Sequence, residues 1–248
     1  TLHAASNPWM GWLTRRSMRR ASALHTDCAA DQARARCWGF AAGKPSIVLP
    51  GNGGIDLALF HPGEGAGDLL RVINPRGVRA YVRNDTFFQA IPLVLKELPG
   101  ARFVCLGMQG EALAERWLAE LGTAAQVALL PKLPREQVAA VFQASAVAIS
   151  PTTHDGTPNT LLEAMACGCF PIVGDILSLR EWIEPGVNGF LVDPGDPAAL
   201  AGAVVLALRD ADLRRRAQAH NARLIAERAE YQACMGRVEA FYQELINT

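Results

Sequence analysis

The sequence has no net charge and very little lysine. Its 24 lysines and arginines balance its 24 aspartates and glutamates, so it lacks the basic field that is typical of proteins that bind nucleic acid. Lysine occurs only as Lys44, Lys96 and Lys132, and none of these is an obvious attachment point for a pyridoxal cofactor. These shortages argue against a nucleic-acid partner and against a pyridoxal-dependent enzyme.

The six cysteines are scattered along the chain rather than paired. No two Cys-x-x-Cys groups stand at the spacing of a zinc site, and we expect no metal. Cys105 lies in an apolar run, which favours reduced, buried thiols in a cytosolic protein. The run Cys167-Gly168-Cys169 leaves a redox pair as the less favoured alternative, because its surroundings are not electropositive.

Long apolar runs are also missing. No segment could cross a bilayer and the first residues lack the pattern of a secretory signal, so we expect a cytoplasmic protein. The chain opens without a methionine and without a strand before its first helix, which predicts a piece of a larger protein. That helix, Pro8–Arg20, carries Trp9, Trp12 and four arginines. Contact with the cytoplasmic face of a membrane is one interpretation, and packing of the tryptophans into a groove between domains is the favoured one.

What is present is a regular alternation of strands and helices, starting near residue 67. Strand-like apolar runs are expected at Leu70–Ile73, Arg102–Leu106, Gln126–Leu130, Ala146–Ser150, Phe170–Val173 and Gly189–Val192. Helices are expected between and after them, at Asp85–Leu98, Glu111–Leu121, Pro134–Ala144, Thr160–Ala166 and Pro197–Leu208. Alternation of this kind builds βαβ units, and strands that are apolar throughout are buried on both faces. The sequence therefore predicts an α/β fold, with a Rossmann-like parallel sheet and helices on both faces.

Shorter elements flank this region. Before it we expect strands at Ala23–Asp27 and Ser46–Leu49, a helix at Asp31–Cys37, a sharp turn at Pro50–Asp56 and a linker at His61–Gly67. After Ala211 the chain is expected to form two helices that meet near Ala229. Pro92 lies inside an otherwise helical run and is expected to bend that helix.

The loop after Ala146–Ser150 is where a ligand is expected, because parallel sheets bind ligands at the carboxyl ends of their strands. Gly156 and Pro158 predict a tight turn, and Asn159 is a suitable N-cap for a helix that Gly168 closes. The free amides at that helix N-terminus, with the helix dipole behind them, favour a phosphate group.

Two carboxylates flank this anion site. Glu163 lies one turn into the helix, and because a carboxylate repels phosphate, its expected partner is a pair of sugar hydroxyls. Asp155 precedes the turn and is placed to reach a transferred group. The pattern alone leaves an alternative open, in which Asp155 and Asn159 only cap the turn and Glu163 is a solvated helix residue.

These residues form part of a longer motif. Asp155-x7-Glu163, continued by Ala-Met-Ala-Cys-Gly and by Pro171-Ile-Val, resembles the Glu-x7-Glu signature of the large family of retaining glycosyltransferases with the GT-B fold, called group 1 or family 4. The segment from Leu179 to Asp196 resembles the part of that family that follows the signature. The segment from Ser46 to Asp56, with Phe60, resembles its entry into the second domain. The resemblance covers nearly the whole chain.

The resemblance implies a C-terminal half of a GT-B enzyme that transfers a hexosyl group with retention and without a metal. Residues 1–66 would be the end of an N-terminal acceptor domain and the linker, 67–210 the donor-binding domain, and 211–248 helices that return toward the first domain. The co-substrate would be a UDP- or GDP-linked sugar, with no other cofactor. The acceptor would be an unknown glycan, lipid or small molecule, which places the protein in glycan biosynthesis.

The resemblance also assigns roles to single residues. Glu163 would hold the ribose hydroxyls, Asp155 would approach the donor sugar and Arg76 would bind the diphosphate. The backbone of the turn and first helical residues would also meet the diphosphate; these are Gly156, Thr157, Pro158, Asn159 and Thr160. The motif departs from the family in its first acidic residue, which is Asp rather than the commoner Glu and is one methylene shorter.

A second departure concerns a basic residue. The family's lysine a few residues after the arginine has no clear counterpart, so Arg83 or Arg79 would supply that charge. Lys132 and Arg135 flank a loop where the nucleotide base could dock, and His154 is a candidate contact for the donor sugar. Ordinary surface charge and a local hydrogen bond are the alternatives.

Three other functions stay open. Asp155 and Glu163 could form a glycosidase pair, although a helix N-terminus between them suits a phosphate leaving group better. A sugar-nucleotide-binding or regulatory module without catalysis would fit the missing lysine. A sugar-nucleotide epimerase of the same fold would share the sheet and the nucleotide site.

Overall fold

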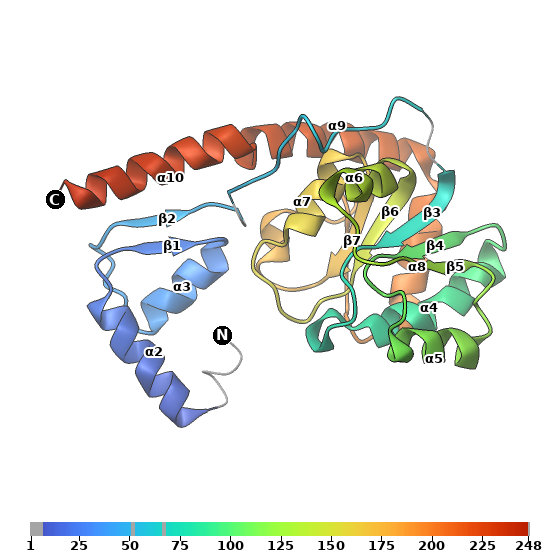
Figure 1. The fold of residues 1–248 in the computed structure, drawn as a ribbon, viewed down its shortest axis with the longest axis horizontal. Helices are drawn as coiled ribbons and strands as arrows, with labels where there is room; N and C mark the ends of the chain where they lie inside the picture. Colours follow the sequence, from blue (N-terminus) through green and yellow to red (C-terminus); the bar gives the residue numbers. More distant parts are fainter. Residues whose placement is uncertain (1–6, 51–52, 66–67, 248) are drawn as a thin grey trace.

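The computed structural model describes residues 7–50, 53–65 and 68–247, and its main body is a parallel sheet of six strands (Figure 1). The strands are β3 (Asp68–Asn74), β4 (Arg102–Cys105), β5 (Val127–Leu129), β6 (Ser145–Ser150), β7 (Phe170–Gly174) and β8 (Phe190–Val192). They lie in the order β5-β4-β3-β6-β7-β8, and every neighbouring pair is parallel. This order is that of a Rossmann-like sheet, which confirms the predicted fold class.

Helices cover both faces of the sheet. They are α4 (Asn84–Glu97), α5 (Ala112–Leu121), α6 (Arg135–Gln143), α7 (Asn159–Ala166), α8 (Pro197–Arg209) and α9 (Ala211–Arg228), with short 3-10 turns η1 (Ala80–Val82) and η2 (Leu179–Glu181). Helices α4, α5 and α8 pack on one side, and α6, α7 and the later part of α9 pack on the other. The two apolar cores explain why strands such as β7 are buried along their whole length.

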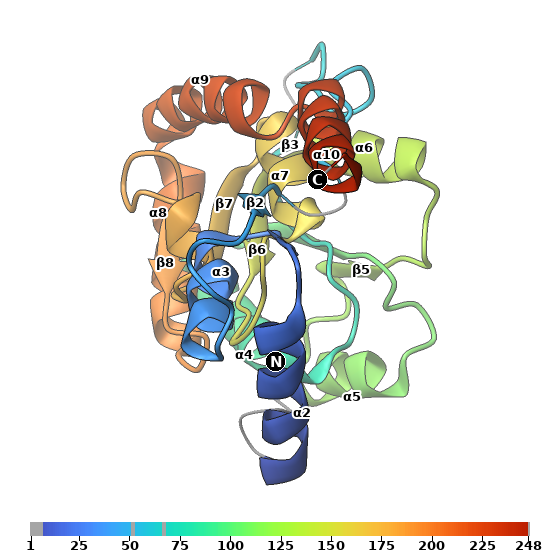
Figure 2. The ribbon, with the colours of Figure 1, turned by 90° about the vertical axis from the view of Figure 1, so that its left-hand side faces the viewer.

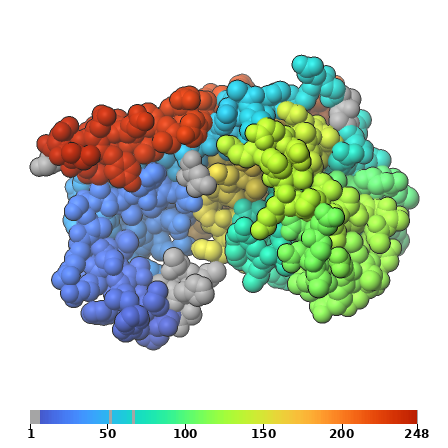
Figure 3. All heavy atoms as spheres, viewed as in Figure 1, coloured from blue at the N-terminus to red at the C-terminus, as the bar shows by residue number. Residues whose placement is uncertain are grey.

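The chain begins with a smaller first unit, residues 8–48. It consists of α2 (Pro8–Arg20), β1 (Leu24–Thr26), α3 (Ala29–Cys37) and β2 (Ser46–Val48), and the two short strands pair in parallel. Helix α10 (Tyr231–Ile246) returns from the main body and lies along this unit, opposite α2 (Figures 1 and 2). In the space-filling view, α10 covers one side of the first unit (Figure 3).

The segment that leaves the first unit and the segment that returns to it lie side by side. The amide of Ile55 donates to the carbonyl of Ala229 over 2.7 Å, and the amide of Tyr231 donates to the carbonyl of Ile55 over 3.0 Å. These backbone bonds join Ile55 to the junction between α9 and α10. The sequence predicted that the two helices meet at this junction. Tyr242 on α10 adds an edge-on ring contact with His25 of β1.

The remaining structural expectations have mixed outcomes. Asn159 is the first residue of α7 rather than its cap, because the extended Pro158 before it occupies the cap position. Helix α4 continues through Pro92. Trp9 and Trp12 are 66% and 55% exposed, so the interpretation that buried them in a groove is wrong for the described part of the chain.

Two further expectations concern sequence ranges and the membrane. Gly51 and Asn52 of the predicted turn, and residues 66 and 67 of the predicted linker, lie outside the described residues. Among the helices that the structure describes, none combines the length and the apolar character needed to cross a bilayer.

Candidate functional site

Strands β3 and β6 lie side by side at the centre of the sheet, and their connections leave toward opposite flanks. A crevice forms at such a switch point, outside the carboxyl ends of the strands. The turn Asn74-Pro-Arg-Gly follows β3, and the loop from Pro151 to Pro158 follows β6. The two segments that carry the predicted motifs are therefore neighbours.

Two buried asparagines shape the turn after β3. Asn74 accepts from the amide of Arg76 over 3.2 Å and donates to Asn84 Oδ1 over 2.8 Å. Asn84, at the start of α4, donates in turn to the carbonyl of Gly77 over 2.7 Å, and Gly77 has a φ of +64°. This chain of bonds fixes where Arg76 leaves the backbone. Sequence reasoning missed both asparagines, and the only available signal was a polar residue at the end of an apolar strand.

Arg76 reaches across the crevice to the second motif. Its Nη2 lies 2.6 Å from Asp155 Oδ2, its Nη1 donates to Thr160 Oγ1 over 3.2 Å, and its Nε is buried without a protein partner. The side chains of Arg76 and Asp155 are 11% and 17% exposed. Burial raises the pKa of Asp155 above its ordinary value, and the charge of Arg76 only partly opposes this shift.

A cavity of about 390 Å³ opens beside Arg76. The polar side chains that line it are Arg76, Arg79, Glu111, Lys132, Arg135, Thr160 and Glu163, and Phe60, Leu106, Leu133 and Val138 supply apolar walls. Burial raises the pKa of Glu163, with Arg135 acting in the opposite direction. A single cavity thus joins several cationic side chains, the first turn of α7 and two carboxylates, Glu111 and Glu163. Sequence reasoning did not anticipate Glu111.

The turn before α7 is occupied by contacts with the first unit. The hydroxyl of Thr157 donates to the carbonyl of Asp27 over 2.6 Å, and its amide lies 3.4 Å from Asp27 Oδ2. Trp182 Nε1 donates to the same hydroxyl over 3.2 Å. Thr157 and Pro158 are buried, while Gly156 packs against the Asp27 carboxylate. Of the residues predicted to meet the diphosphate through this turn, only Thr160 lines the cavity.

Seven of the predicted residues lie outside the lining of this cavity: Arg83, His154, Asp155, Gly156, Thr157, Pro158 and Asn159. Arg83 has a left-handed backbone, with φ of +47°, and its guanidinium is held by Asp85 through bonds of 2.9 Å. His154 borders a separate hollow on the other side of Asp155. Arg79 does line the cavity, and its Nη1 donates to the hydroxyl of Tyr81 over 3.0 Å.

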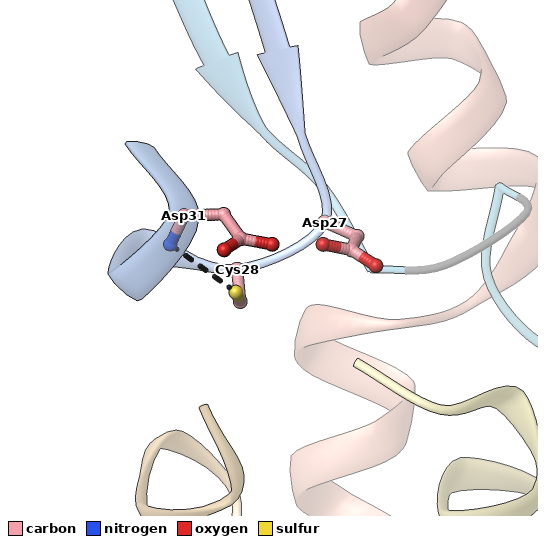
Figure 4. Close-up of side chains that lie close together, drawn as sticks. All are labelled: Asp27, Cys28 and Asp31. Atoms are coloured by element: carbon pink, nitrogen blue, oxygen red, sulfur yellow. Dashed lines mark hydrogen bonds between the residues drawn. The ribbon is translucent and has the colours of Figure 1, made fainter. Parts of the chain in front are cut away.

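One group of potential metal ligands occurs in the described part of the chain, in the first unit: Asp27, Cys28 and Asp31 (Figure 4). Each of them already has a protein partner. Asp31 pairs with Arg34, Cys28 Sγ accepts from the amide of Asp31 over 3.4 Å, and Asp27 meets Thr157. Burial raises the pKa of the Cys28 thiol to about 12, which keeps it protonated. We therefore assign this group to local structure and to packing against the turn before α7.

Comparison with known proteins finds relatives of this chain over most of its length. The sequence profile of the family described as "Glycosyl transferases group 1" matches residues 77–210, which is more than half of the chain. A D-inositol 3-phosphate glycosyltransferase from Thermobispora bispora is 28% identical over 221 residues. That match covers 82% of this chain and 51% of the relative, so the chain spans about half of the relative's length.

Solved structures share the fold at lower identity. Sucrose-phosphate synthase from Thermosynechococcus elongatus superposes with a TM-score of 0.82 at 18% identity, over 100% of this chain and 64% of its own. The pneumococcal O-GlcNAc transferase GtfA, determined in complex with UDP and GlcNAc, superposes with a TM-score of 0.82 at 16% identity. That match covers 98% of this chain and 48% of its own.

Proposed function

We propose that this chain, which belongs to the glycosyl transferases group 1 family, is the donor-binding part of a retaining, metal-independent hexosyltransferase. The observation that carries the proposal is the single cavity at the switch point, where Arg76, the first turn of α7 and Glu163 face the same space. A nucleoside diphosphate has the matching features: an anionic diphosphate, and a ribose with two neighbouring hydroxyls.

The charges in the cavity give the donor one orientation. Glu163 would repel a diphosphate, so its place is with the ribose hydroxyls, which it can accept from with both oxygens. The diphosphate then belongs near Arg76, Thr160 and the amides at the start of α7. Lys132 and Arg135, which also line the cavity, are left for the base. UDP is our first choice of nucleotide, since the pneumococcal enzyme of the same fold binds it.

Arg76 has the chemical role in this proposal. When the bond between the anomeric carbon and the diphosphate oxygen breaks, negative charge grows on the diphosphate, and a fixed guanidinium stabilises it. The acceptor oxygen forms the new bond to that carbon and releases its proton. Arg76 would thereby serve in place of a metal, and Arg79, which lines the same cavity, is a better placed second cation than Arg83. Retention of configuration is part of the same proposal, because the motif resembles that of retaining enzymes.

The rest of the enzyme is also part of the proposal. Residues 1–66 would be the end of an acceptor domain with its linker, 67–210 the donor domain, and 211–248 the returning helices. The short β1-β2 pair is too small a sheet to fold independently, and α10 lies along it as a returning helix would. The acceptor domain would account for the half of the relative that this chain does not match.

Calorimetric titration with UDP tests the proposal. We expect measurable binding that falls by about tenfold or more in Arg76→Ala, because a charge-assisted hydrogen bond contributes about 1.5–3 kcal/mol. Arg116→Ala is the matched control, since Arg116 is an exposed residue of α5. Equal UDP affinity in both variants would count against the assignment, and UDP binding without any transfer by the enzyme with its acceptor domain would favour the non-catalytic module.

A further inference from the structure

A second hollow, of about 340 Å³, lies behind Asp155 and is distinct from the donor cavity. It is bounded by the start of α3, by residues 153–155 after β6 and by residues 175–180 after β7. Among the described residues that line the two spaces, none is shared. Arg76 borders one space, Asp155 borders the other, and their side chains are 2.6 Å apart. A donor whose diphosphate meets Arg76 would present its sugar to Asp155 and hence to this hollow.

The walls of the hollow are held in place by bonds between distant segments. Both oxygens of the Glu181 carboxylate accept from amides at the start of α3, those of Ala29 and Ala30, over 2.9 Å. Ser178 donates to the carbonyl of Asp155 over 2.7 Å. The first unit and the donor domain therefore form one preorganised wall, which lowers the entropy cost of holding a ligand there.

Every carboxylate in the hollow is neutralised by an arginine. Asp31 pairs with Arg34, Asp155 with Arg76, and Asp175 with Arg180 through two bonds of 2.6 and 2.8 Å. In the free protein the hollow thus offers both hydrogen-bond acceptors and donors, with its carboxylates and arginines paired. A hydroxyl both donates and accepts, so neighbouring hydroxyls match such a lining.

Other ligand classes fit less well. A phosphorylated acceptor would need a cation that is not already paired. Both arginines of the hollow are paired, which leaves His154 as the other basic side chain among its described lining residues. An aromatic acceptor would need a stacking surface, and no Phe, Tyr or Trp occurs among the described residues of the lining. The exposed Leu177 supplies one apolar side chain, as sugar faces require.

We propose that this hollow is the acceptor subsite and that it takes an uncharged polyhydroxylated group, such as the end of a glycan. The proposal rests on the proposed function, because it assumes that the donor sugar arrives at Asp155. It differs from what the name of the matched relative states, since that acceptor carries a phosphate.

Saturation-transfer NMR on the full chain with UDP present tests it, using methyl α-D-glucopyranoside as the neutral probe and glucose 6-phosphate as the anionic one. The double variant Asp175→Ala, Arg180→Ala removes one exposed ion pair from the hollow. We expect it to weaken binding of the glycoside by about fivefold or more, since hydrogen bonds to ionised groups are lost. The variant Asp212→Ala, Arg215→Ala removes a similar exposed pair from α9 and should leave it unchanged.

UDP affinity should stay the same in both double variants, because none of these four residues lines the donor cavity. Three results would each overturn the inference. They are glycoside binding that is undiminished in the first variant, no glycoside binding to protein that does bind UDP, and a preference for glucose 6-phosphate. Failure of UDP to bind is a different result, which would overturn the proposed function. The glycoside titration without UDP then decides whether the hollow binds sugars.

Discussion

The ion pair between Arg76 and Asp155 sets up a competition that one substitution can reveal. In the free protein the two side chains bond over 2.6 Å and are 11% and 17% exposed. A diphosphate that binds Arg76 draws the guanidinium away from Asp155. It leaves a mostly buried carboxylate without its partner, unless a hydroxyl of the donor sugar replaces the guanidinium. Free UDP has no such sugar.

We therefore expect Asp155→Asn to bind UDP more tightly than the wild type. Two unit charges at 4 Å attract each other by about 4 kcal/mol at an effective dielectric constant of about 20. Part of this is already offset because Asp155 is desolvated, as its raised pKa indicates. A net release of about 1–2 kcal/mol corresponds to a Kd lower by about five- to thirtyfold. Transfer should nevertheless be lost, because the resemblance to the family assigns Asp155 to the donor sugar.

Calorimetric titration with UDP at neutral pH measures the effect. Asp212→Asn is the control, since it removes a carboxylate from an exposed ion pair on α9. Thermal unfolding should show the same competition from the other side. UDP should raise the Tm of the Asp155→Asn protein by more than it raises that of the wild type. A UDP affinity that is unchanged or weaker in Asp155→Asn would refute the reasoning.

Three further predictions concern stability. Glu163→Gln should stabilise the free protein by about 1 kcal/mol at neutral pH. Burial raises the pKa of Glu163 above its ordinary 4.5. The gain in stability should therefore vanish below about pH 4, where Glu163 is protonated in both the folded and the unfolded protein. Melting curves that show a gain only in acid would contradict this sign. Gly156→Ala should lower the free energy of unfolding by about 1–3 kcal/mol, because its Cβ would lie 2.6 Å from Asp27 Cγ. The denaturant midpoint should recover in the double variant with Asp27→Ala, and no recovery would exclude that contact as the cause. Asn84→Ala should lower the free energy of unfolding by about 1–3 kcal/mol, because it removes the hydrogen bonds to Asn74 and Gly77. It should also weaken UDP binding, and an unchanged UDP affinity would show that this turn does not position Arg76.

The sequence predicted the sheet because its strands are apolar throughout and separated by helices at regular spacing. Helix α2 begins and ends at the predicted residues, and the two closing helices meet at Ala229 as expected. The exposure of Trp9 and Trp12 was not predicted. Burial of a side chain depends on what packs against its helix, and no local sequence pattern specifies that. The position of α10 along the first unit likewise depends on contacts between segments far apart in the chain.

In the candidate site too, features set by local sequence could be predicted, and contacts between distant segments could not. The loop that carries Asp155 and Glu163 could be found in the sequence because it follows a strand of a parallel sheet. Arg76 was assigned from the resemblance to the family. The contact between Asp27 and the turn at Thr157 joins residues 130 positions apart, and no local signal indicates it. Nor does any indicate that Arg83 turns away, since this depends on its left-handed backbone and on Asp85. The domain boundaries and the site residues remain predictions.

The central claim is that a nucleoside diphosphate binds in the cavity with its ribose hydroxyls on Glu163. The most direct test compares the affinities of UDP and 2′,3′-dideoxy-UDP for the wild type and for Glu163→Gln. Loss of both hydroxyls should cost the wild type about 3 kcal/mol, or roughly 100-fold in Kd, since each bond to a charged group contributes about 1.5–3 kcal/mol. The ratio should shrink to about tenfold or less in Glu163→Gln, where the acceptor is neutral and has one oxygen. An equal ratio in the two proteins would mean that Glu163 does not hold the ribose, and it would contradict the account.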